Sequence, residues 1–251
     1  MKNCLFYIHS NQTVNRICGK ALKDAGIQLA DTPNNEVTHL LLPIPSFNDD
    51  GTLKGGGNIY DLLNQLSDTV TIIGGNLPEA LCGAHPCIDL LKDPLYMAQN
   101  AYITACCAMR IITMELPVIL RGCKILIIGW GRIAQCLAHL LRNVEADVTL
   151  MIRCPRQRAL ASALGYQTIA PEFISELIPL MRVICNTAPA EIITEEISMR
   201  CTADCLKMDL ASTKGIAGSN VLWARGLPGK DAPESSGKLI AETILQRIQE
   251  A

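Results

Sequence analysis

Runs of aliphatic residues recur along most of the chain, separated by longer stretches in which apolar residues repeat at helical spacing. Short buried strands that alternate with amphipathic helices are typical of α/β proteins with parallel sheets. Two groups of such runs stand on either side of a long apolar stretch that opens at Pro94, a residue tolerated in the first turn of a helix. The pattern therefore predicts two α/β domains joined by a long helix.

The first domain is expected to span residues 1–93 and to contain a small parallel sheet. A helix is predicted at 13–25, closed by Gly26, and Asn58 is placed to cap a second helix. Clusters of turn-forming residues predict loops at 43–51 and 55–57. The aliphatic runs expected to build the sheet are 4–8, 27–30, 37–42 and 70–73.

The linking helix is expected at 94–118, and the second domain at 119–232. Two glycines and two prolines in the segment 226–233 predict a rigid loop near a ligand or a domain junction, or else a tight turn into the last helix. That helix, within 233–251, is expected to pack back on the first domain. The strands expected in the second domain are 124–128, 147–152, 166–169, 183–186, 205–210 and 221–223.

Composition narrows the classes of function. Of the 251 residues 49% are apolar, so the chain can bury a sizeable core, and the scarcity of aromatic residues makes that core aliphatic. A formal net charge of -2, with no basic stripe, predicts neither nucleic acid nor an anionic membrane surface as a partner. The apolar stretch 101–120 carries Arg110 and Glu115, so a buried helix is expected there and not a membrane span.

The 12 cysteines are scattered, with no C-x-x-C pair, which predicts free thiols in a reducing compartment. The segment 1–9 is too short and too soon interrupted for the apolar part of a secretory signal, so a cytoplasmic protein is expected. The 4 histidines fall at no recognisable ligand spacing from the cysteines. No metal site is therefore expected.

The junction after the strand 124–128 carries the strongest motif. Gly129, Gly131 and Ala134 form G-x-G-x-x-A between an aliphatic run and an amphipathic stretch, the order of a strand, a tight turn and a helix whose N-terminus receives a pyrophosphate. Gly129 permits the turn, Gly131 lets the backbone approach the phosphates, and Ala134 lets the helix lie close to the strand. The motif predicts a Rossmann domain, with a doubly wound parallel sheet that binds a dinucleotide.

The end of the strand 147–152 indicates which dinucleotide binds. A carboxylate for the ribose 2′-hydroxyl is expected there in an NAD-binding domain, but the strand ends at Arg153, followed by Arg156 and Arg158. A guanidinium suits a 2′-phosphate, so NADP is predicted over NAD, with Arg153 as the main contact and Arg156 or Arg158 as a second. The alternative is a solvated helix start with incidental arginines.

Polar residues follow the later strands at the edge where open α/β sheets bind ligands. Asn186, Thr187 and Pro189 are candidates to line the ribose and nicotinamide, although an ordinary strand-to-helix loop explains each of them as well. Asp209 and Lys214 are expected to face the same crevice, or to lie at the surface.

The histidines argue against simple oxidation of a hydroxyl group, which needs an acid/base beside the nicotinamide. After Gly131 only His139 remains, within the helix of the dinucleotide motif. Oxidation that removes a ring proton has less need of a histidine, and Lys214, Asp209 or water are candidate bases. Lys230 is a candidate partner for a substrate carboxylate.

The order of several motifs resembles the dipicolinate synthase A family. The most specific is GLPG-x-x-AP at 226–233, because generic Rossmann domains do not share it. The resemblance covers nearly the whole chain, with departures at Trp130 and at Thr213-Lys214. The other matching segments are LLP at 41–43, KDPLY at 92–96, GWGR at 129–132, the arginine at 153, CNTAP at 185–189 and DLAS at 209–212.

The resemblance implies a smaller flavodoxin-like N-terminal α/β domain and a C-terminal Rossmann domain like that of the D-isomer-specific 2-hydroxyacid dehydrogenases. It implies NADP-linked oxidation of dihydrodipicolinate to dipicolinate, a reaction of sporulation, together with a second, flavoprotein-like subunit. Homo-oligomer formation is a further expectation.

The site residues expected from this interpretation fall into four groups. Gly129, Trp130, Gly131, Arg132 and Ile133 would surround the pyrophosphate, and Arg153 would hold the 2′-phosphate. The nicotinamide would be flanked by Thr187, Ala188 and Pro189, and the carboxylates of a small dicarboxylate substrate would meet Ser46, Asn76, Lys214 and Lys230.

Two alternatives remain open at this point. One is a D-2-hydroxyacid dehydrogenase that uses NAD or NADP, which the missing late histidine disfavours. The other is an NADP-binding partner protein that is inactive by itself and needs the flavoprotein-like subunit to complete its site.

Overall fold

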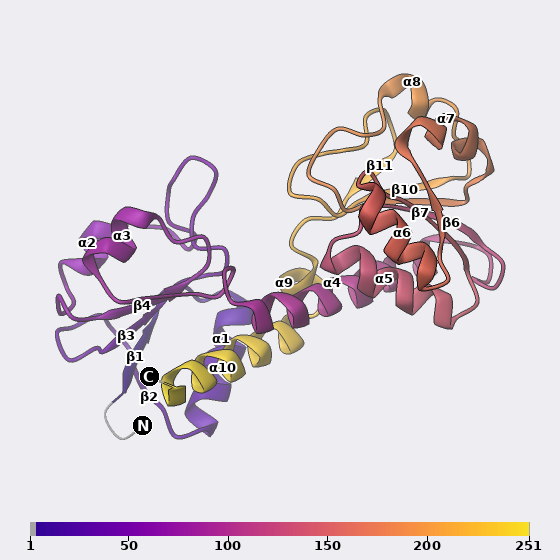
Figure 1. The fold of residues 1–251 in the computed structure, drawn as a ribbon. Coiled ribbons are helices and arrows are strands. Elements are labelled where there is room, and N and C mark those ends of the chain that lie inside the picture. The colour runs from indigo at the N-terminus through magenta and orange to yellow at the C-terminus, as the bar shows by residue number, and fades with distance from the viewer. Residues whose placement is uncertain (1–3, 251) are drawn as a thin grey trace. The chain divides into compact units, whose positions relative to one another are not determined.

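The computed structural model describes residues 4–250, which form two compact units (Figure 1). The first unit comprises the described residues up to Asn100 together with those from Pro228 onward, and the second comprises Ala101–Leu227. Helix α4 (Pro94–Glu115) contributes its first turns to one unit and the remainder to the other. Residues 1–3 and 251, which our expected domains include, lie outside the described residues.

The first unit contains a parallel sheet whose strands follow the order β2-β1-β3-β4-β5. This is the flavodoxin-like order, in which the chain reverses its direction of winding between β1 and β3. The expected flavodoxin-like fold is therefore confirmed. The strands are β1 (Leu5–Ile8), β2 (Gln28–Ala30), β3 (His39–Leu41), β4 (Thr71–Gly74) and β5 (Cys87–Asp89).

The edge strand β5 was not expected, because it has no aliphatic run and its three residues are all half-buried. The cap on α2 (Ile59–Leu63) was expected, and there Asn58 Oδ1 accepts a hydrogen bond from Tyr60 N at 2.8 Å. The remaining helices of this unit are α1 (Thr13–Asp24), α3 (Glu79–Ala84) and α10 (Pro233–Glu250).

Helix α10, the last in the chain, packs along α1 in the same unit (Figure 1). A Cβ on Gly237 would lie 2.8 Å from Ile17 Cβ and 2.8 Å from Val14 O, so only glycine permits this close approach of the two helices. Gly19 on α1 lies against the sheet in the same way, because a Cβ there would meet Ile8 Cδ1 at 2.8 Å. Small residues thus set the spacing of three layers.

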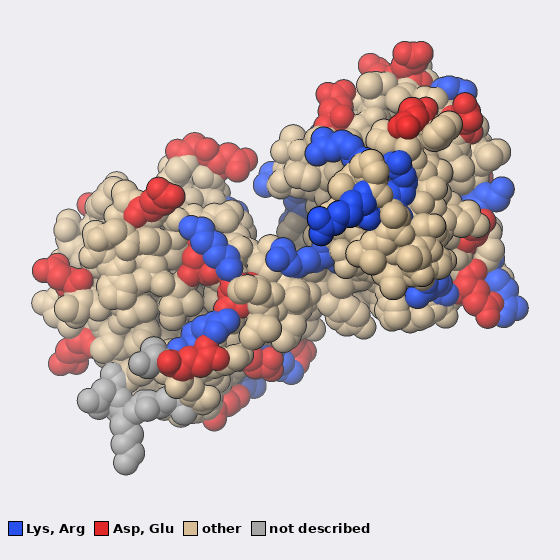
Figure 2. Space-filling view, viewed as in Figure 1, with Lys and Arg blue, Asp and Glu red and all other residues tan. Residues whose placement is uncertain are grey.

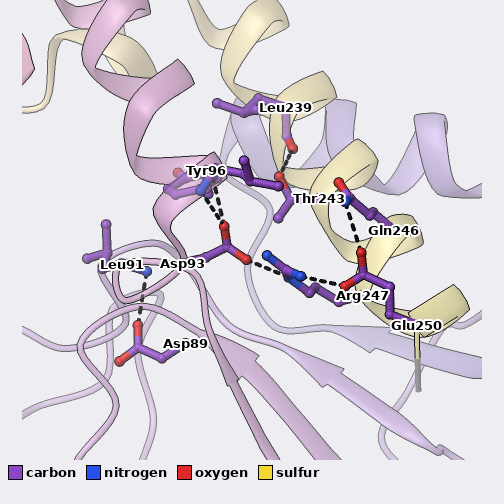
Figure 3. A network of polar contacts seen from close by, with 10 residues as sticks. Asp89, Leu91, Asp93, Tyr96, Leu239, Thr243, Gln246, Arg247 and Glu250 are labelled. Atoms are coloured by element: carbon purple, nitrogen blue, oxygen red, sulfur yellow. Dashed lines mark hydrogen bonds and ion pairs between the residues drawn. The ribbon is translucent and has the colours of Figure 1, made fainter.

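A polar network ties the start of α4 to the end of α10 (Figure 3). Asp93 Oδ1 accepts hydrogen bonds from Leu95 N at 2.8 Å and Tyr96 N at 2.9 Å, which caps α4. Asp93 Oδ2 accepts from Arg247 Nε at 2.6 Å, and Arg247 also contacts Glu250. Burial of Asp93 would raise its pKa, but the hydrogen bond from Arg247 and those from the two amides outweigh burial and lower the pKa.

The second unit contains a parallel sheet with the strand order β11-β10-β9-β6-β7-β8. Read from β6 as the first strand, this is the Rossmann order 3-2-1-4-5-6, so the predicted doubly wound sheet is confirmed. Four residues of β6, Ile125 to Ile128, have no exposed surface, as expected for a central strand covered on both faces. The strands are β6 (Lys124–Ile128), β7 (Asp147–Met151), β8 (Gln167–Ile169), β9 (Val183–Asn186), β10 (Leu206–Asp209) and β11 (Val221–Trp223).

Besides the remainder of α4, this unit contains four shorter α-helices within its strand connections. They are α5 (Arg132–Asn143), α6 (Pro155–Ala163), α7 (Ile174–Leu177) and α8 (Glu195–Ser198). Among residues 4–250, no helix is both long and apolar enough to cross a membrane.

The expected rigid loop at 226–233 is wrong in part, because Leu227–Asp231 form the short helix α9. Ala232 N donates to Pro228 O at 3.1 Å, and α10 then begins at Pro233. Both prolines lie in the first turn of a helix, where the missing N–H has no intrahelical partner to lose. Proline-rich sequence near a helix start is therefore compatible with a helical turn as well as a loop.

Candidate cofactor site

The turn between β6 and α5 has the backbone that the dinucleotide motif requires. Gly129 has φ +105°, in the region that favours glycine. A Cβ on Gly129 would lie 2.7 Å from Thr187 Oγ1, a hydroxyl that donates to Ile128 O at 2.8 Å. Gly129 is therefore required both by its conformation and by the close packing of the β6 and β9 loops.

At Gly131, neither the backbone conformation nor the packing requires a glycine. It is the N-cap of α5 with an ordinary φ of -76°, and a Cβ built on it would meet nothing within 4 Å. No side chain caps the first turn of α5, so the amides of that turn have no side-chain acceptor. Buried Ala134 lets the helix lie close to the sheet. This is a cradle of backbone donors with room for a phosphate group.

A pocket of about 310 Å³ opens at the same edge of the sheet. It lies where the chain reverses its winding, between the carboxyl ends of β6 and β9, which is where doubly wound sheets bind nucleotides. The lining residues come from the ends of β6, β7 and β9: Ile128, Gly129, Trp130, Met151, Ile152, Arg153, Cys154, Gln157, Ala188, Pro189, Ala190 and Ile192.

Of the three arginines after β7, only Arg153 lines this pocket. Arg158 Nη1 donates to Ile152 O at 3.0 Å, which holds its guanidinium on the backbone. Arg156 is exposed on the first turn of α6. None of the described residues that line the pocket is acidic. The wall at Arg153 is therefore suited to an anion.

Cys154, the N-cap of α6, lies in the same anion-stabilising environment as Arg153. A role for Cys154 was not expected from the sequence. The amides of Gln157 and Arg156 lower the pKa of its thiol, and the nearby charges of Arg156 and Arg158 lower it further. Groups that stabilise a thiolate at this rim would also stabilise a phosphate. A cysteine before a proline-initiated, arginine-rich helix start is the sequence signal for this feature.

Trp130, the bulky residue between the two glycines, forms part of the pocket wall. Its ring packs edge-on against Tyr166, with 5.5 Å between the ring centroids, and the Arg142 guanidinium lies 4.3 Å from the Tyr166 centroid. Gln135 Nε2 donates to Trp130 O at 2.9 Å. These contacts hold the indole of Trp130 against Tyr166.

The structure argues against the catalytic role expected for Asp209. The side chain has no exposed surface, and its two oxygens accept hydrogen bonds from three backbone amides and one side chain. A carboxylate that is buried and accepts four hydrogen bonds from the protein cannot take a proton from a substrate. The donors are Asn186 Nδ2 at 3.0 Å, Ala211 N at 3.0 Å, Gly215 N at 2.6 Å and Ile216 N at 3.0 Å.

The partner of Asp209, Asn186, is equally buried and fixes the loop after β9. Its Nδ2 donates to Ala188 O at 2.9 Å, and its Oδ1 accepts from Ala188 N at 3.1 Å. A Cβ on Gly215 would lie 2.3 Å from Asn186 Nδ2, so the loops after β9 and β10 interlock. Asn186 therefore positions Thr187, Ala188 and Pro189, of which Ala188 and Pro189 line the pocket.

Lys214 lies in the loop after β10, and its side chain is exposed. Its Nζ is 5.0 Å from the ring centroid of Trp223, and the Arg225 Cζ is 5.2 Å from the same centroid. Trp223 and Arg225 were not expected from the sequence. A tryptophan at the end of an edge strand, two residues before an arginine, is the signal that was available.

The remaining candidates for substrate contacts belong to the first unit. Ser46 is fully buried, and its hydroxyl donates to Pro43 O at 2.9 Å and accepts from Gly75 N at 3.0 Å. The hydroxyl is therefore engaged within the first unit. Asn76 is exposed with φ +55°, and Lys230 is exposed on α9. Within residues 4–250, no three His, Cys, Asp or Glu side chains are arranged to hold a metal ion.

Comparison with known proteins gives a sequence relative. Dipicolinate synthase A of Bacillus subtilis (strain 168) is 24% identical over 139 residues, which is 52% of this chain and 47% of that protein. The match therefore spans about half the length of the curated relative. No protein-family model matches the chain.

Solved structures extend the likeness in fold to nearly the whole chain. The crystal structure of dipicolinate synthase A from Bacillus subtilis has a TM-score of 0.82 at 17% identity and covers 100% of this chain and 97% of that one. The dipicolinate synthase A structure from Bacillus halodurans has a TM-score of 0.81, also at 17% identity, and covers 97% of each chain.

D-lactate dehydrogenase from Escherichia coli is also similar in fold, with a TM-score of 0.67 at 12% identity over 98% of this chain and 96% of that one. The expected likeness to the 2-hydroxyacid dehydrogenases is confirmed at the level of fold. The chain is thus similar to dipicolinate synthase A, in sequence over about half of its length and in fold over nearly all of it.

Proposed function

We propose that the chain is an NADP-dependent oxidoreductase of the dipicolinate synthase A type, which oxidises dihydrodipicolinate to dipicolinate. One observation carries the proposal. The same pocket brings together the turn at Gly129, the guanidinium side chain of Arg153 and the loop at Ala188 and Pro189, at the winding reversal of a Rossmann sheet.

Different residues at this edge of the sheet would bind different parts of the dinucleotide. The amides of the first turn of α5, beginning at Arg132 and Ile133, would bind the pyrophosphate, with Gly131 leaving space for it and Trp130 closing one side. Arg153 would hold the 2′-phosphate, with exposed Arg156 within the same helix start as a second cation. Thr187, Ala188 and Pro189 would flank the nicotinamide.

The bound dinucleotide supplies a hydride acceptor, and the ring of the substrate gives up a hydride and a proton to become aromatic. The protein's part is to orient the ring and to keep its carboxylates in place. In this proposal Lys214, in the loop after β10, binds a substrate carboxylate. Water takes the ring proton, since Asp209 is engaged with backbone amides and with Asn186.

The same geometry disfavours a D-2-hydroxyacid dehydrogenase. Reduction of a keto group needs a proton donor beside the nicotinamide, usually histidine. The one histidine of the second unit, His139, is exposed on α5, and its Nε2 lies 3.2 Å from Asn143 Nδ2. It is therefore engaged on the surface of the helix.

A companion protein is part of the proposal, because the relatives are named as one subunit of a synthase. The chain binds the dinucleotide in this interpretation, whether or not it turns over substrate alone. In this proposal the protein is cytoplasmic, as its scattered cysteines predict.

Calorimetric titration with NADP, NADPH and NADH tests the cofactor assignment. We expect NADPH to bind more tightly than NADH by at least about tenfold, and Arg153→Ala to remove that preference while leaving NADH affinity nearly unchanged. Arg121→Ala, which removes an exposed arginine before β6, is the matched control. Well-folded protein that binds no dinucleotide would contradict the proposal.

The reaction is tested with freshly prepared dihydrodipicolinate and NADP, with and without a candidate companion protein. Formation of NADPH by the chain alone supports an independent enzyme. NADPH formation only with both proteins supports a cofactor-binding protein that needs its companion. Turnover of a small 2-keto acid with NADH, and none of dihydrodipicolinate, would favour the hydroxyacid dehydrogenase instead.

A further inference from the structure

Trp223 is an exposed indole at a place in the fold where ligands bind. It is the last residue of the edge strand β11, and 40% of its surface is exposed. Its Nε1 donates to Ala211 O at 3.2 Å, which fixes the ring against the loop after β10. A large aromatic side chain that is fixed at the surface, at the carboxyl edge of a Rossmann sheet, indicates a binding site for a ligand.

Two cations from different segments share this ring. Lys214 Nζ lies 5.0 Å from the Trp223 centroid and Arg225 Cζ lies 5.2 Å from it. Cation–π contacts at exposed sites are weak, so the exposed Lys214 ammonium can turn to an anion that offers charge-assisted hydrogen bonds. The five N–H donors of the Arg225 guanidinium allow it to bind a carboxylate in addition to its other contacts.

The loop that carries Lys214 is rigid. Asp209 accepts hydrogen bonds from the amides of Ala211, Gly215 and Ile216, which lie on both sides of Lys214. Gly215 packs directly on Asn186, with no space for a Cβ. The buried carboxylate thus holds the lysine in place beside the indole, and little ordering of the backbone is needed when a ligand binds.

The position of these residues in the sheet suits a substrate. The pocket that contains Arg153 covers the ends of β7, β6 and β9, on both sides of the winding reversal. A dinucleotide spans the reversal, so its second half extends over β9, β10 and β11. Lys214 follows β10, and Trp223 is the last residue of β11, at that same edge. In Figure 2 many Lys and Arg side chains gather on one side of this unit.

We propose that Lys214, Trp223 and Arg225 form a binding site, here called the seat, for a flat ring that bears two carboxylates. This proposal rests on the proposed function and identifies the residues that contact its substrate. The indole packs against the ring, the Lys214 ammonium binds one carboxylate, and the Arg225 guanidinium binds the other in bidentate fashion. Lys214 and Arg225 together therefore select a dicarboxylate over a ring with a single carboxylate.

The chain has 2 tryptophans, which makes the seat directly observable. Trp130→Phe leaves Trp223 as the one indole, and titration with pyridine-2,6-dicarboxylate should then quench its fluorescence in a saturable way. Pyridine-2-carboxylate should bind at least about tenfold more weakly, or about 1.4 kcal/mol. Calorimetry on the unaltered chain gives the same affinities without any substitution, in case Trp130→Phe folds poorly.

Charge removal locates the binding residues. Lys214→Met and Arg225→Met should each lower affinity for pyridine-2,6-dicarboxylate about tenfold, and each should reduce its advantage over pyridine-2-carboxylate. Lys124→Met is the matched control, because Lys124 is an exposed lysine at the amino end of β6, on the opposite edge of the sheet, and its loss should leave affinity unchanged. Affinity within twofold of the unaltered chain in both seat variants would overturn the proposal.

NADPH affinity, measured on the same proteins, separates this proposal from the proposed function. Loss of dicarboxylate binding with NADPH binding retained supports the seat. Dicarboxylate binding that depends on Lys214 and Arg225 in a chain that binds no NADPH supports the seat and contradicts the proposed function. NADPH binding together with dicarboxylate affinity that ignores both residues overturns the seat alone.

Discussion

Asp93 and Arg247 are separated by 154 positions in the sequence, and Arg247 Nε donates to Asp93 Oδ2 at 2.6 Å. Asp93 is nearly buried, whereas Arg247 is about a third exposed, with a side-chain exposure of 30%. The same carboxylate caps α4 through the amides of Leu95 and Tyr96. One side chain therefore secures both the start of α4 and the last turn of the C-terminal helix.

Replacing Asp93 should destabilise the first unit. Asp93→Ala removes the cap and leaves Arg247 without its main partner, so we expect a loss of about 2 kcal/mol in the free energy of unfolding, measured by urea denaturation. Arg247→Met should cost less, because the cap on α4 remains. Lys238→Met, which breaks the exposed pair with Glu234, is the control and should change nothing measurable. Equal losses in all three variants would contradict this account.

Acid should weaken the same contact. The pKa of Asp93 in the folded protein is lowered, so its stabilising contribution is present above the unfolded value of about 3.9 and is lost as pH falls through the lower folded value. We expect the stability difference between the unaltered chain and Asp93→Asn to be constant from pH 7 to about 5 and to shrink below about pH 4. A difference that grows as the pH falls would contradict the assignment.

Asp209→Asn separates a positioning residue from a catalytic one. An asparagine keeps one acceptor oxygen but turns an NH₂ group toward amides that need an acceptor, so the loop 211–216 should lose its fixed conformation. We expect a loss of about 2–4 kcal/mol in unfolding free energy, together with weaker binding of the dicarboxylate. If the variant unfolds like the unaltered chain and loses only turnover, Asp209 is a catalytic residue after all.

Several strands of the second unit could be located closely from the sequence, whereas the roles of polar side chains were harder to predict. The strands predicted at 124–128, 183–186 and 221–223 coincide with β6, β9 and β11, the first two because aliphatic runs buried on both faces leave no other solution. The half-buried strand β5 has no such run and was missed.

Polar side chains at strand ends were harder to assign, because sequence position does not reveal which hydrogen bonds a side chain makes. Ser46 follows β3 and Asp209 ends β10, positions at which ligand-binding residues occur, yet their oxygens accept hydrogen bonds from backbone amides of the protein. Trp223 and Arg225 were missed for the opposite reason. Their importance comes from Lys214, which is close in space but lies on another loop.

Gly129→Ala should disturb the fold as well as the site. The substitution forces a side chain into a backbone with φ +105° and places a Cβ 2.7 Å from Thr187 Oγ1. We expect a loss of about 1–3 kcal/mol in unfolding free energy, because both the strain and the contact with the β9 loop must be relieved. Thermal unfolding of the purified variant measures this loss, and an unchanged midpoint would show that the turn adapts.

Gly131→Ala separates an effect on ligand binding from an effect on stability. Its φ of -76° is ordinary and a Cβ would meet nothing within 4 Å, so the protein alone gives no reason for glycine at this position. The variant should therefore unfold within about 0.5 kcal/mol of the unaltered chain. If a pyrophosphate approaches this backbone, the added methyl group must push it away, and NADPH affinity should fall at least about tenfold. A variant that keeps both its stability and its NADPH affinity would mean that the dinucleotide does not bind over this turn.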